Sequence, residues 1–278
     1  MLSDTTIQEN NCYELKGITS LNIRIVTLQL GDEQIELMEY LNVQGRPIPK
    51  DSQSNDLCFQ HMAILVSDMN RAYTHLQTFE VESISVAPQT IPPENQTAAG
   101  MQAFKFKDRD RHNLELILFP PGKGQSKWHH ACKHLFLGID HSAIVVSSTE
   151  QSLHFYRDLL GLQVKDSSFN CEETQARLDN LTGAKVKVTG LRPAHQGLGI
   201  ELLEYVAPAN SHPQSRQWKI TDIGHMQVEL FVDDIEQVPK VLQQNKIEFL
   251  PFHQGYLVKD PDGHAMLLKQ NKKISLQS

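Results

Sequence analysis

Apolar and polar positions alternate along several short stretches of the chain. In FQHMAIL, residues 59–65, the alternation predicts a strand that carries His61 on the same face as three apolar side chains. Asp68 then suits the cap of a helix that continues to about residue 76. An imidazole on an apolar face is costly to bury unless it is hydrogen-bonded or binds a metal ion. His61 is therefore the first candidate functional residue.

The order of strand, capping residue and helix recurs along the chain. QIELMEYL at 34–41 returns as GIELLEYV at 199–206, and FKFKDRDRHNLELI at 104–117 returns as YLVKDPDGHAMLLK at 256–269. GIDHSAIVVSSTEQSLHFYRDLLG at 138–161 repeats the strand, cap and helix of the first stretch. The chain is thus a predicted tandem duplication in which each half holds units of one strand, one helix and three further strands.

The C-terminal half contains two such units. After the helix of the first, strands are expected at about 162–166, 184–191 and 199–206; the second is expected to have a strand at 224–232, a helix within 234–245, and strands near 247–250, 254–259 and 264–269. Pro239 fits only the first turn of that helix.

The N-terminal half begins partway through its first unit, because the counterpart of His141 would precede residue 1. We expect either that the natural start lies further upstream or that the opening strand and helix have been lost. A lost strand would leave a sheet edge that the N-terminal tail or another subunit covers.

Four motifs, HMAILVSDM, GIDHSAIVVSSTEQSLHFYRDLLGL, IELLEY and KDPDGH, together resemble the vicinal oxygen chelate superfamily. Glyoxalase I, methylmalonyl-CoA epimerase, bleomycin-resistance proteins and extradiol dioxygenases belong to it. The resemblance spans about residues 20–270 and implies an α+β fold of tandem βαβββ modules that form two cup-shaped mixed sheets, the first module lacking its opening strand and helix. We expect an N-terminal domain over 1–127, a linker over 128–137 and a C-terminal domain over 138–278.

In that superfamily a metal ion at the floor of each cup is held by residues on the first and last strands of each module. The matching positions in the N-terminal half are Glu36, His61 and Glu115. A divalent cation would offset the cost of burying these groups together.

The C-terminal half matches the same pattern at His141 and Glu201. Its third position is either Gln227, which keeps the spacing to the helix cap, or His225, which is the better ligand. The fourth position is Leu267, which cannot bind a metal.

This ligand set implies a divalent metal such as Mn, Zn, Ni, Mg or Fe, and a small substrate with two adjacent oxygens. The expected function is that of a metal-dependent isomerase or lyase, with Glu36 or Glu115 as general base. One alternative is an Fe(II) extradiol-type dioxygenase that uses His141, His225 and Glu201. The other is a bleomycin-resistance-like protein that binds a small molecule without converting it.

Three further features have simpler explanations. WHHACKH at 128–134 could bind zinc through His129, His130, Cys132 and His134, but a linker is the plainer interpretation. Arg46 lies in a loop expected near the mouth of the N-terminal cup and could meet an anionic substrate. Tyr40 and Tyr205 are expected to pack with their hydroxyl groups at a wet edge.

Composition narrows the classes of partner. With 26 Lys and Arg against 33 Asp and Glu, the net charge is −7 and no basic run tracks a phosphate backbone, which argues against nucleic acid. No apolar stretch is long enough to cross a bilayer, the N-terminus is polar, and the four cysteines are scattered, so we expect a cytoplasmic protein without a disulfide framework. A homodimer is consistent with the resemblance, because many relatives build cups across two chains.

Overall fold

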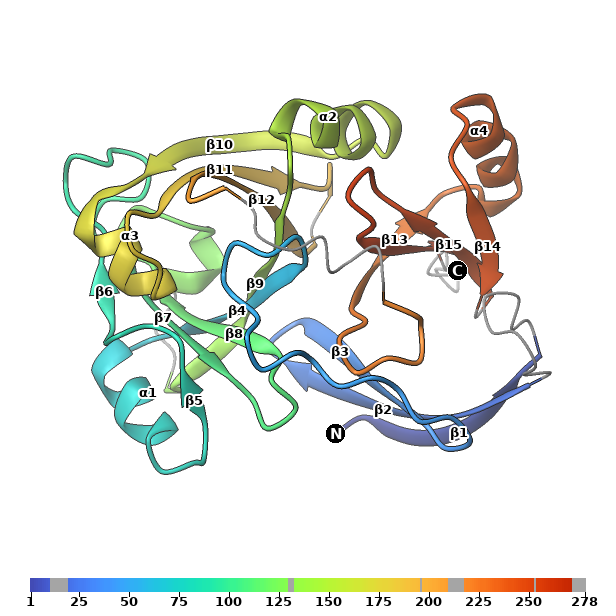
Figure 1. Ribbon diagram of the computed structural model, residues 1–278, viewed down its shortest axis with the longest axis horizontal. Helices are drawn as coiled ribbons and strands as arrows, with labels where there is room; N and C mark the ends of the chain where they lie inside the picture. Colours follow the sequence, from blue (N-terminus) through green and yellow to red (C-terminus); the bar gives the residue numbers. More distant parts are fainter. Residues whose placement is uncertain (11–19, 130–132, 196, 210–217, 253, 272–278) are drawn as a thin grey trace, which may run out of the picture.

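The structure of the protein is a computed structural model that describes residues 1–10, 20–129, 133–195, 197–209, 218–252 and 254–271 (Figure 1). The chain forms three β-sheets with short helices on their outer faces. The expected α+β fold class is confirmed.

The strands fall into three sheets. The three-stranded sheet consists of β1 (Ser3–Glu9), β2 (Leu21–Leu30) and β3 (Glu33–Tyr40), in that order. The nine-stranded sheet has the order β10-β11-β12-β9-β4-β8-β7-β5, with β6 also paired to β7. Its strands are β4 (Phe59–Val66), β5 (Glu82–Ser83), β6 (Gln89–Thr90), β7 (Gln102–Lys107), β8 (Asn113–Leu118), β9 (Phe136–Val145), β10 (Gln163–Asn170), β11 (Lys185–Arg192) and β12 (Gly199–Ala207). The four-stranded sheet has the order β13-β16-β15-β14 and consists of β13 (Gln227–Val232), β14 (Phe249–Phe252), β15 (Gly255–Lys259) and β16 (Ala265–Gln270).

The helices are short, and most follow the opening strand of a module. They are α1 (Met69–Leu76), the 3-10 helix η1 (Ser126–His129), α2 (Thr149–Leu153) with the π-helix η2 (His154–Leu159), α3 (Glu172–Asp179), the 3-10 helix η4 (Ile235–Gln237) and α4 (Val238–Gln244).

The nine-stranded sheet joins the two halves of the chain. Strand β4 from the N-terminal half pairs antiparallel with β9 from the C-terminal half. The second module, β4 to β8, therefore shares a cup with the third module, β9 to β12. The expectation of one cup within each half is wrong. The physical reason is that two opening strands meet at the centre of a cup, and the described part of the first module has no opening strand to offer β4.

The first module, β1 to β3, packs against the fourth module, β13 to β16. Leu21, Ile23 and Ile25 of β2 form one apolar cluster with Leu257 of β15 and Leu267 of β16. In Figure 1 the three-stranded sheet accordingly lies beneath the four-stranded sheet, on the opposite side of the molecule from α3. Apolar side chains, Leu267 among them, therefore fill the space between these two sheets.

Local signals in the sequence account for the ends of several helices. Asp68 accepts a hydrogen bond from the backbone N–H of Arg71 and caps α1, and Ser148 does the same for α2. Pro239 lies in the first turn of α4, as its missing N–H requires. Gly161 ends the second helical segment with a φ of 77°, a value that glycine adopts without strain.

Helix α3 was not expected from the sequence. It lies between β10 and β11, and Figure 1 places it beside the nine-stranded sheet, away from the four-stranded one. Its last residue, Asp179, is buried against the cup. The cup therefore has a cover that the repeat pattern did not predict.

The start of the expected linker also packs into the fold. Trp128 is buried in η1 and belongs to an apolar cluster with Ala63, Leu65 and Ile117 on the floor of the cup. None of the helices in the described ranges is long and apolar enough to cross a membrane.

Candidate metal centre

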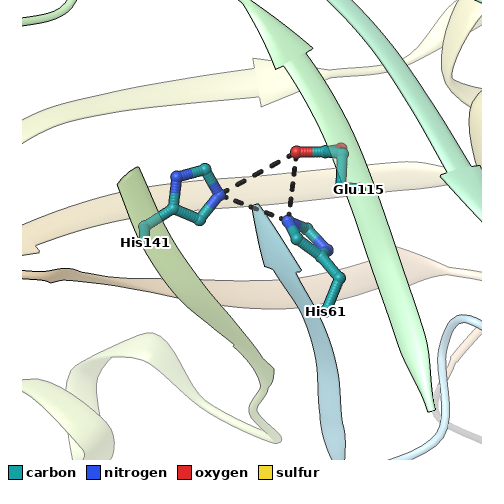
Figure 2. Close-up of side chains that lie close together, drawn as sticks. All are labelled: His61, Glu115 and His141. Carbon is teal, nitrogen blue, oxygen red and sulfur yellow. Dashed lines mark hydrogen bonds and ion pairs between the residues drawn. The ribbon is translucent and has the colours of Figure 1, made fainter. Parts of the chain in front are cut away.

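Four ionisable side chains converge in the cup of the nine-stranded sheet. Figure 2 shows His61, Glu115 and His141 pointing toward one another. The Nε2 atom of His61 lies 3.2 Å from Nε2 of His141 and 3.2 Å from Oε2 of Glu115. His141 Nε2 lies 4.0 Å from the same Glu115 oxygen and 3.3 Å from Oε2 of Glu201.

Sheet register brings these groups together. His61 and Glu115 come from β4 and β8, which run parallel with Ala63 opposite Glu115. His141 and Glu201 come from β9 and β12, which are parallel in the same way, with Gly199 opposite His141. The second and third modules thus each contribute one histidine from their first strand and one glutamate from their last strand.

The ring of His141 is held by a carboxylate. Its Nδ1 lies 3.1 Å from Oδ2 of Asp140, so Nδ1 donates its proton to that acceptor. Asp140 is itself fixed by Trp128 Nε1 at 2.9 Å and by Arg192 Nη2 at 2.5 Å. These contacts turn Nε2 of His141 toward the centre of the cup.

The ring of His61 is held by a chain of hydrogen bonds. Its Nδ1 donates to Oε1 of Gln60, and the Gln60 amide donates to the hydroxyl oxygen of Tyr205 at 3.2 Å. Tyr205 donates in turn to Asp179 at 2.8 Å, and Lys105 Nζ lies 2.7 Å from the other oxygen of Asp179. Because Nδ1 of the neutral ring is the donor, Nε2 of His61 presents a lone pair to the cup.

Burial and neighbouring charges separate the protonation states of the two histidines. Burial lowers the pKa of His61 to about 4, even with Glu115 beside it. Burial also opposes a charge on His141, but Glu201, Asp140 and Glu115 outweigh it and raise its pKa to about 9. At neutral pH the pKa values therefore leave His61 neutral and His141 protonated.

The two glutamates differ in the same way. Burial would raise the pKa of Glu115, but His61, Lys105 and His141 overcome it and hold the pKa at about 2. The pKa of Glu201 is raised, chiefly by burial and then by the repulsion of Glu115 and Asp140, although His141 opposes the rise. Glu201 also has the most accessible side chain of the four, 25% exposed.

The donor set fits a divalent cation. Metal–ligand bonds of about 2.1 Å separate ligand atoms by roughly 3.0 Å at right angles and by roughly 4.2 Å when they are opposite. The separations among His61, Glu115 and His141, of 3.2, 3.2 and 4.0 Å, match two adjacent pairs and one nearly opposite pair, and Glu201 lies 3.3 Å from His141 Nε2. Two imidazole nitrogens with lone pairs facing at 3.2 Å would repel each other without a proton or a metal ion between them.

The other predicted ligands lie elsewhere. Glu36 is exposed on β3 in the three-stranded sheet, so its grouping with His61 and Glu115 is wrong, and with it the expectation that Glu36 acts as a base beside them. The reason is that the first module joins the fourth, not the second. His225 lies 3.2 Å from Gln227 of β13, which belongs to the four-stranded sheet, whereas His141 lies in the nine-stranded sheet and is grouped with His61 and Glu115.

Two other expectations can be compared with the structure, and a third falls partly outside the described residues. Arg46 bonds to Asp222 at 2.6 Å and stacks on Trp218, which ties the loop after β3 to the segment before β13. Tyr205 is buried with its hydroxyl on Asp179, so its expected place at a wet edge is wrong. Within WHHACKH, His130 and Cys132 lie outside the described residues.

Sequence reasoning missed the residues that orient the two imidazoles. Gln60 and Asp140 each directly precede a candidate histidine, in FQHM and IDHS, and this shared polar position was the available signal. Lys105 is opposite Glu115 in the pairing of β7 with β8, so alternation alone would have placed it in the cup. Asp179 had no such signal, because α3 lies outside the repeated unit.

The fold and the site define a cup-forming protein with a candidate metal centre. Residues 138–268 match the family model described as Glyoxalase/Bleomycin resistance protein/Dioxygenase superfamily. This part of the chain belongs to that superfamily, and the resemblance stated from the sequence is confirmed.

Solved structures extend the likeness to the rest of the fold. Glyoxalase I from Zea mays superposes with a TM-score of 0.56 at 14% identity, covering 94% of this chain and 85% of that one. A Bacillus subtilis protein named as a candidate dioxygenase superposes with a TM-score of 0.54 at 12% identity, covering 90% of this chain and 73% of that one. No curated protein matches the sequence. At these identities the likeness concerns the fold alone.

Proposed function

We propose that the protein is a metal-dependent isomerase or lyase acting on a small substrate with two adjacent oxygens. The observation that carries the proposal is the convergence of the His61 and His141 imidazoles with the Glu115 carboxylate inside one cup, with Glu201 beside His141. Residues His61, Glu115, His141 and Glu201 would hold the cation. A bound divalent metal would supply Lewis acidity toward two neighbouring substrate oxygens.

Nitrogen and carboxylate ligands together suit borderline ions such as Zn, Ni, Mn or Fe(II) better than a site built of oxygen alone. The dioxygenase alternative calls for two histidines and a single carboxylate, and His61, His141 and Glu115 are such a set. The observation that favours an isomerase or lyase is the second carboxylate, Glu201, beside His141. The set expected for a dioxygenase from the sequence, His141 with His225 and Glu201, is not assembled.

Glu201 replaces Glu36 as the proposed base. Its raised pKa favours taking up a proton, and it is the most exposed of the four side chains. Glu201 would remove a proton from the carbon beside a substrate carbonyl; the electron pair of the broken C–H bond forms the C=C bond of an enediolate, and the former carbonyl oxygen takes the negative charge. Transfer of the hydroxyl proton to that oxygen, and return of the abstracted proton from Glu201 to the former carbonyl carbon, complete an isomerisation with no net oxidation.

Glu115 has a different role in this proposal. Its pKa of about 2 keeps it ionised, and Lys105 and His61 stabilise that charge. It would remain a ligand throughout, while Asp140 and Gln60 keep the two imidazoles directed inward.

The test is proton exchange at carbon in D2O. We expect the metal-loaded protein to exchange the C–H hydrogen of short α-hydroxyaldehydes or α-hydroxyketones, followed by proton NMR. Glu201→Gln should abolish exchange, whereas Glu36→Gln, a matched change outside the cup, should leave it intact. Binding of these compounds without exchange would overturn the enzyme proposal and favour the small-molecule-binding alternative.

A further inference from the structure

Two acceptors compete for the ring proton of His61. Oε2 of Glu115 lies 3.2 Å from Nε2, and Oε1 of Gln60 lies beside Nδ1. A neutral imidazole has one N–H and one lone pair, so its proton faces only one of these acceptors. A carboxylate is the stronger acceptor, and Glu115 by itself would draw the proton to Nε2 and leave no lone pair there for a metal ion. The ring therefore needs an opposing influence at Nδ1.

Gln60 does not provide this influence alone. Its amide has an acceptor oxygen at one corner and a donor NH2 at the other, and a half turn exchanges them. With Oε1 toward the ring, Nδ1 has to donate; with the NH2 toward the ring, Nδ1 has to accept and the proton moves to Nε2. Gln60 is 1% exposed, so its orientation depends on a protein partner at its other end.

Tyr205 is that partner. Its hydroxyl donates to Oδ2 of Asp179 at 2.8 Å, and its oxygen accepts from Nε2 of Gln60 at 3.2 Å. Burial and the neighbouring Asp179 raise the pKa of Tyr205 well above its ordinary value, so the hydroxyl keeps its proton. Because that proton is used on Asp179, Tyr205 has none to give to Gln60. The Gln60 NH2 is thus held on the tyrosine, and Oε1 is held on His61.

The direction of this chain begins at a buried ion pair. Nζ of Lys105 lies 2.7 Å from Oδ1 of Asp179, and Nε2 of Gln175 lies 2.6 Å from Oδ2. Burial opposes the charge on Lys105, but Asp179 and Glu115 outweigh it and raise its pKa. A carboxylate that faces an ammonium group is ionised and can only accept hydrogen bonds. Tyr205 therefore has to donate to Asp179.

The end of α3 keeps Asp179 in place. Oγ of Ser54 donates to the backbone oxygen of Asp179 at 2.9 Å, and Oγ of Ser85 donates to that of Leu178 at 2.6 Å. These carbonyl groups lie in the last turn of the helix, where no intrahelical donor remains for them. Both serines come from the second module, whereas α3 belongs to the third. The position of Asp179 is thus fixed across the cup.

We propose that Tyr205, acting through Gln60, is a positioning residue that keeps the proton of His61 on Nδ1 and its Nε2 lone pair toward the cup. The inference deepens the proposed function, because His61 is one of the ligands which that function would use. His141 needs no such chain, since its Nδ1 donates directly to Asp140, and a carboxylate has no donor face to present.

Tyr205→Phe tests the proposal, because it removes the hydroxyl and keeps the ring. The Gln60 NH2 then loses its acceptor, and a half turn of the amide lets it donate to Nδ1 of His61. We expect the ring proton to move to Nε2, where Glu115 accepts it. The result would be a change of tautomer without the loss of any proposed ligand.

Long-range proton–nitrogen NMR of 15N-histidine-labelled, chelator-treated protein distinguishes the two tautomers. The measurement is made in a His141→Ala background, because a proton on His141 can also bond to Nε2 of His61. The signals of His61 are identified by their loss in His61→Gln. We expect Nδ1–H with Tyr205 present and Nε2–H in Tyr205→Phe.

Two further variants separate positioning from a merely structural role. Tyr40→Phe makes the same change at the counterpart of Tyr205 in the repeated motif, in the three-stranded sheet, and should leave Nδ1–H in place. Gln60→Glu added to Tyr205→Phe should return the proton to Nδ1, because a carboxylate beside the ring can only accept. A structural defect caused by Tyr205→Phe would not be repaired in this way.

Metal affinity gives the second readout. With His141 present, Tyr205→Phe should lower the affinity for Zn by about 10- to 100-fold, and the added Gln60→Glu should restore it. Retention of Nδ1–H in Tyr205→Phe would overturn the proposal, and so would a failure of Gln60→Glu to return the proton. A shift of the proton in a protein that binds no metal would support the role of Tyr205 and contradict the proposed metal-dependent function.

Discussion

The Nε2 atoms of His61 and His141 lie 3.2 Å apart, although the residues are 80 positions apart in the sequence. Both Nδ1 protons are committed, one to Gln60 and one to Asp140. The two lone pairs that remain face each other in a buried space. This arrangement requires a positive species between them, either a proton on His141 or a metal ion.

Metal affinity should depend on pH through His141. Its pKa in the metal-free protein is raised to about 9, so at neutral pH the ring is protonated and a metal ion must displace that proton. The apparent association constant should therefore rise by about tenfold per pH unit from pH 7 and level off above pH 9. Calorimetry in two buffers with different ionisation enthalpies should show about one proton released per metal ion bound at pH 7.5. Binding without proton release would contradict this protonation state.

Asp140→Asn should weaken metal binding without removing a ligand. Trp128 and Arg192 now position the Asp140 carboxylate beside His141, and an asparagine amide has no negative charge. Loss of such a supporting carboxylate typically lowers metal affinity by about 10- to 100-fold. The measurement is a competition titration against a coloured chelator. Asp108→Asn is the control, because Asp108 contacts His112 outside the cup at 3.2 Å. Equal losses in both variants would point to a general effect on folding.

Lys105→Met should destabilise the fold. The Lys105–Asp179 ion pair is buried and joins β7 to α3, so removal of the lysine leaves a buried carboxylate without its partner. The free energy of unfolding should fall by about 3–5 kcal/mol, measured by urea denaturation.

A surface pair provides the comparison for this variant. Lys187 is 52% exposed beside Glu204, and Lys187→Met should change the free energy of unfolding by less than about 1 kcal/mol. The double variant Lys105→Met/Asp179→Asn should recover part of the loss, because it removes both charges. A Lys105→Met effect as small as that of Lys187→Met would show that the buried pair does not stabilise α3.

Much of the fold followed from local patterns. Alternation placed His61 and Glu115 on buried faces, and the repeated motifs located the strands of His141 and Glu201. These predictions were correct because successive side chains of a strand point to opposite faces, whatever the strand pairs with. Capping and turn residues, Asp68 and Pro239 among them, fixed helix starts for the same reason.

The composition of the site depended on pairing between distant modules, which no local pattern encodes. Glu36 has the right position in its module, but its module packs against the fourth. Helix α3 could not be predicted either, because it lies outside the repeated unit. Its residue Asp179 contacts Lys105, 74 positions away in the sequence. Long-range pairing thus decided which correctly placed side chains met.

Metal content per chain in glutamate variants tests the central claim most directly. The claim is that the second and third modules form one metal centre from His61, Glu115, His141 and Glu201. The protein would be purified without a histidine tag, loaded with Zn, Ni or Mn, exchanged into metal-free buffer and analysed by elemental mass spectrometry. Circular dichroism would confirm that each variant is folded.

The account predicts about one ion per chain in the unaltered protein and in Glu36→Gln, and loss of the ion in both Glu115→Gln and Glu201→Gln. Loss in Glu36→Gln with retention in Glu201→Gln would contradict it, because the metal would then belong to the N-terminal half alone. An unaltered protein that stays empty with every metal would contradict the metal centre itself.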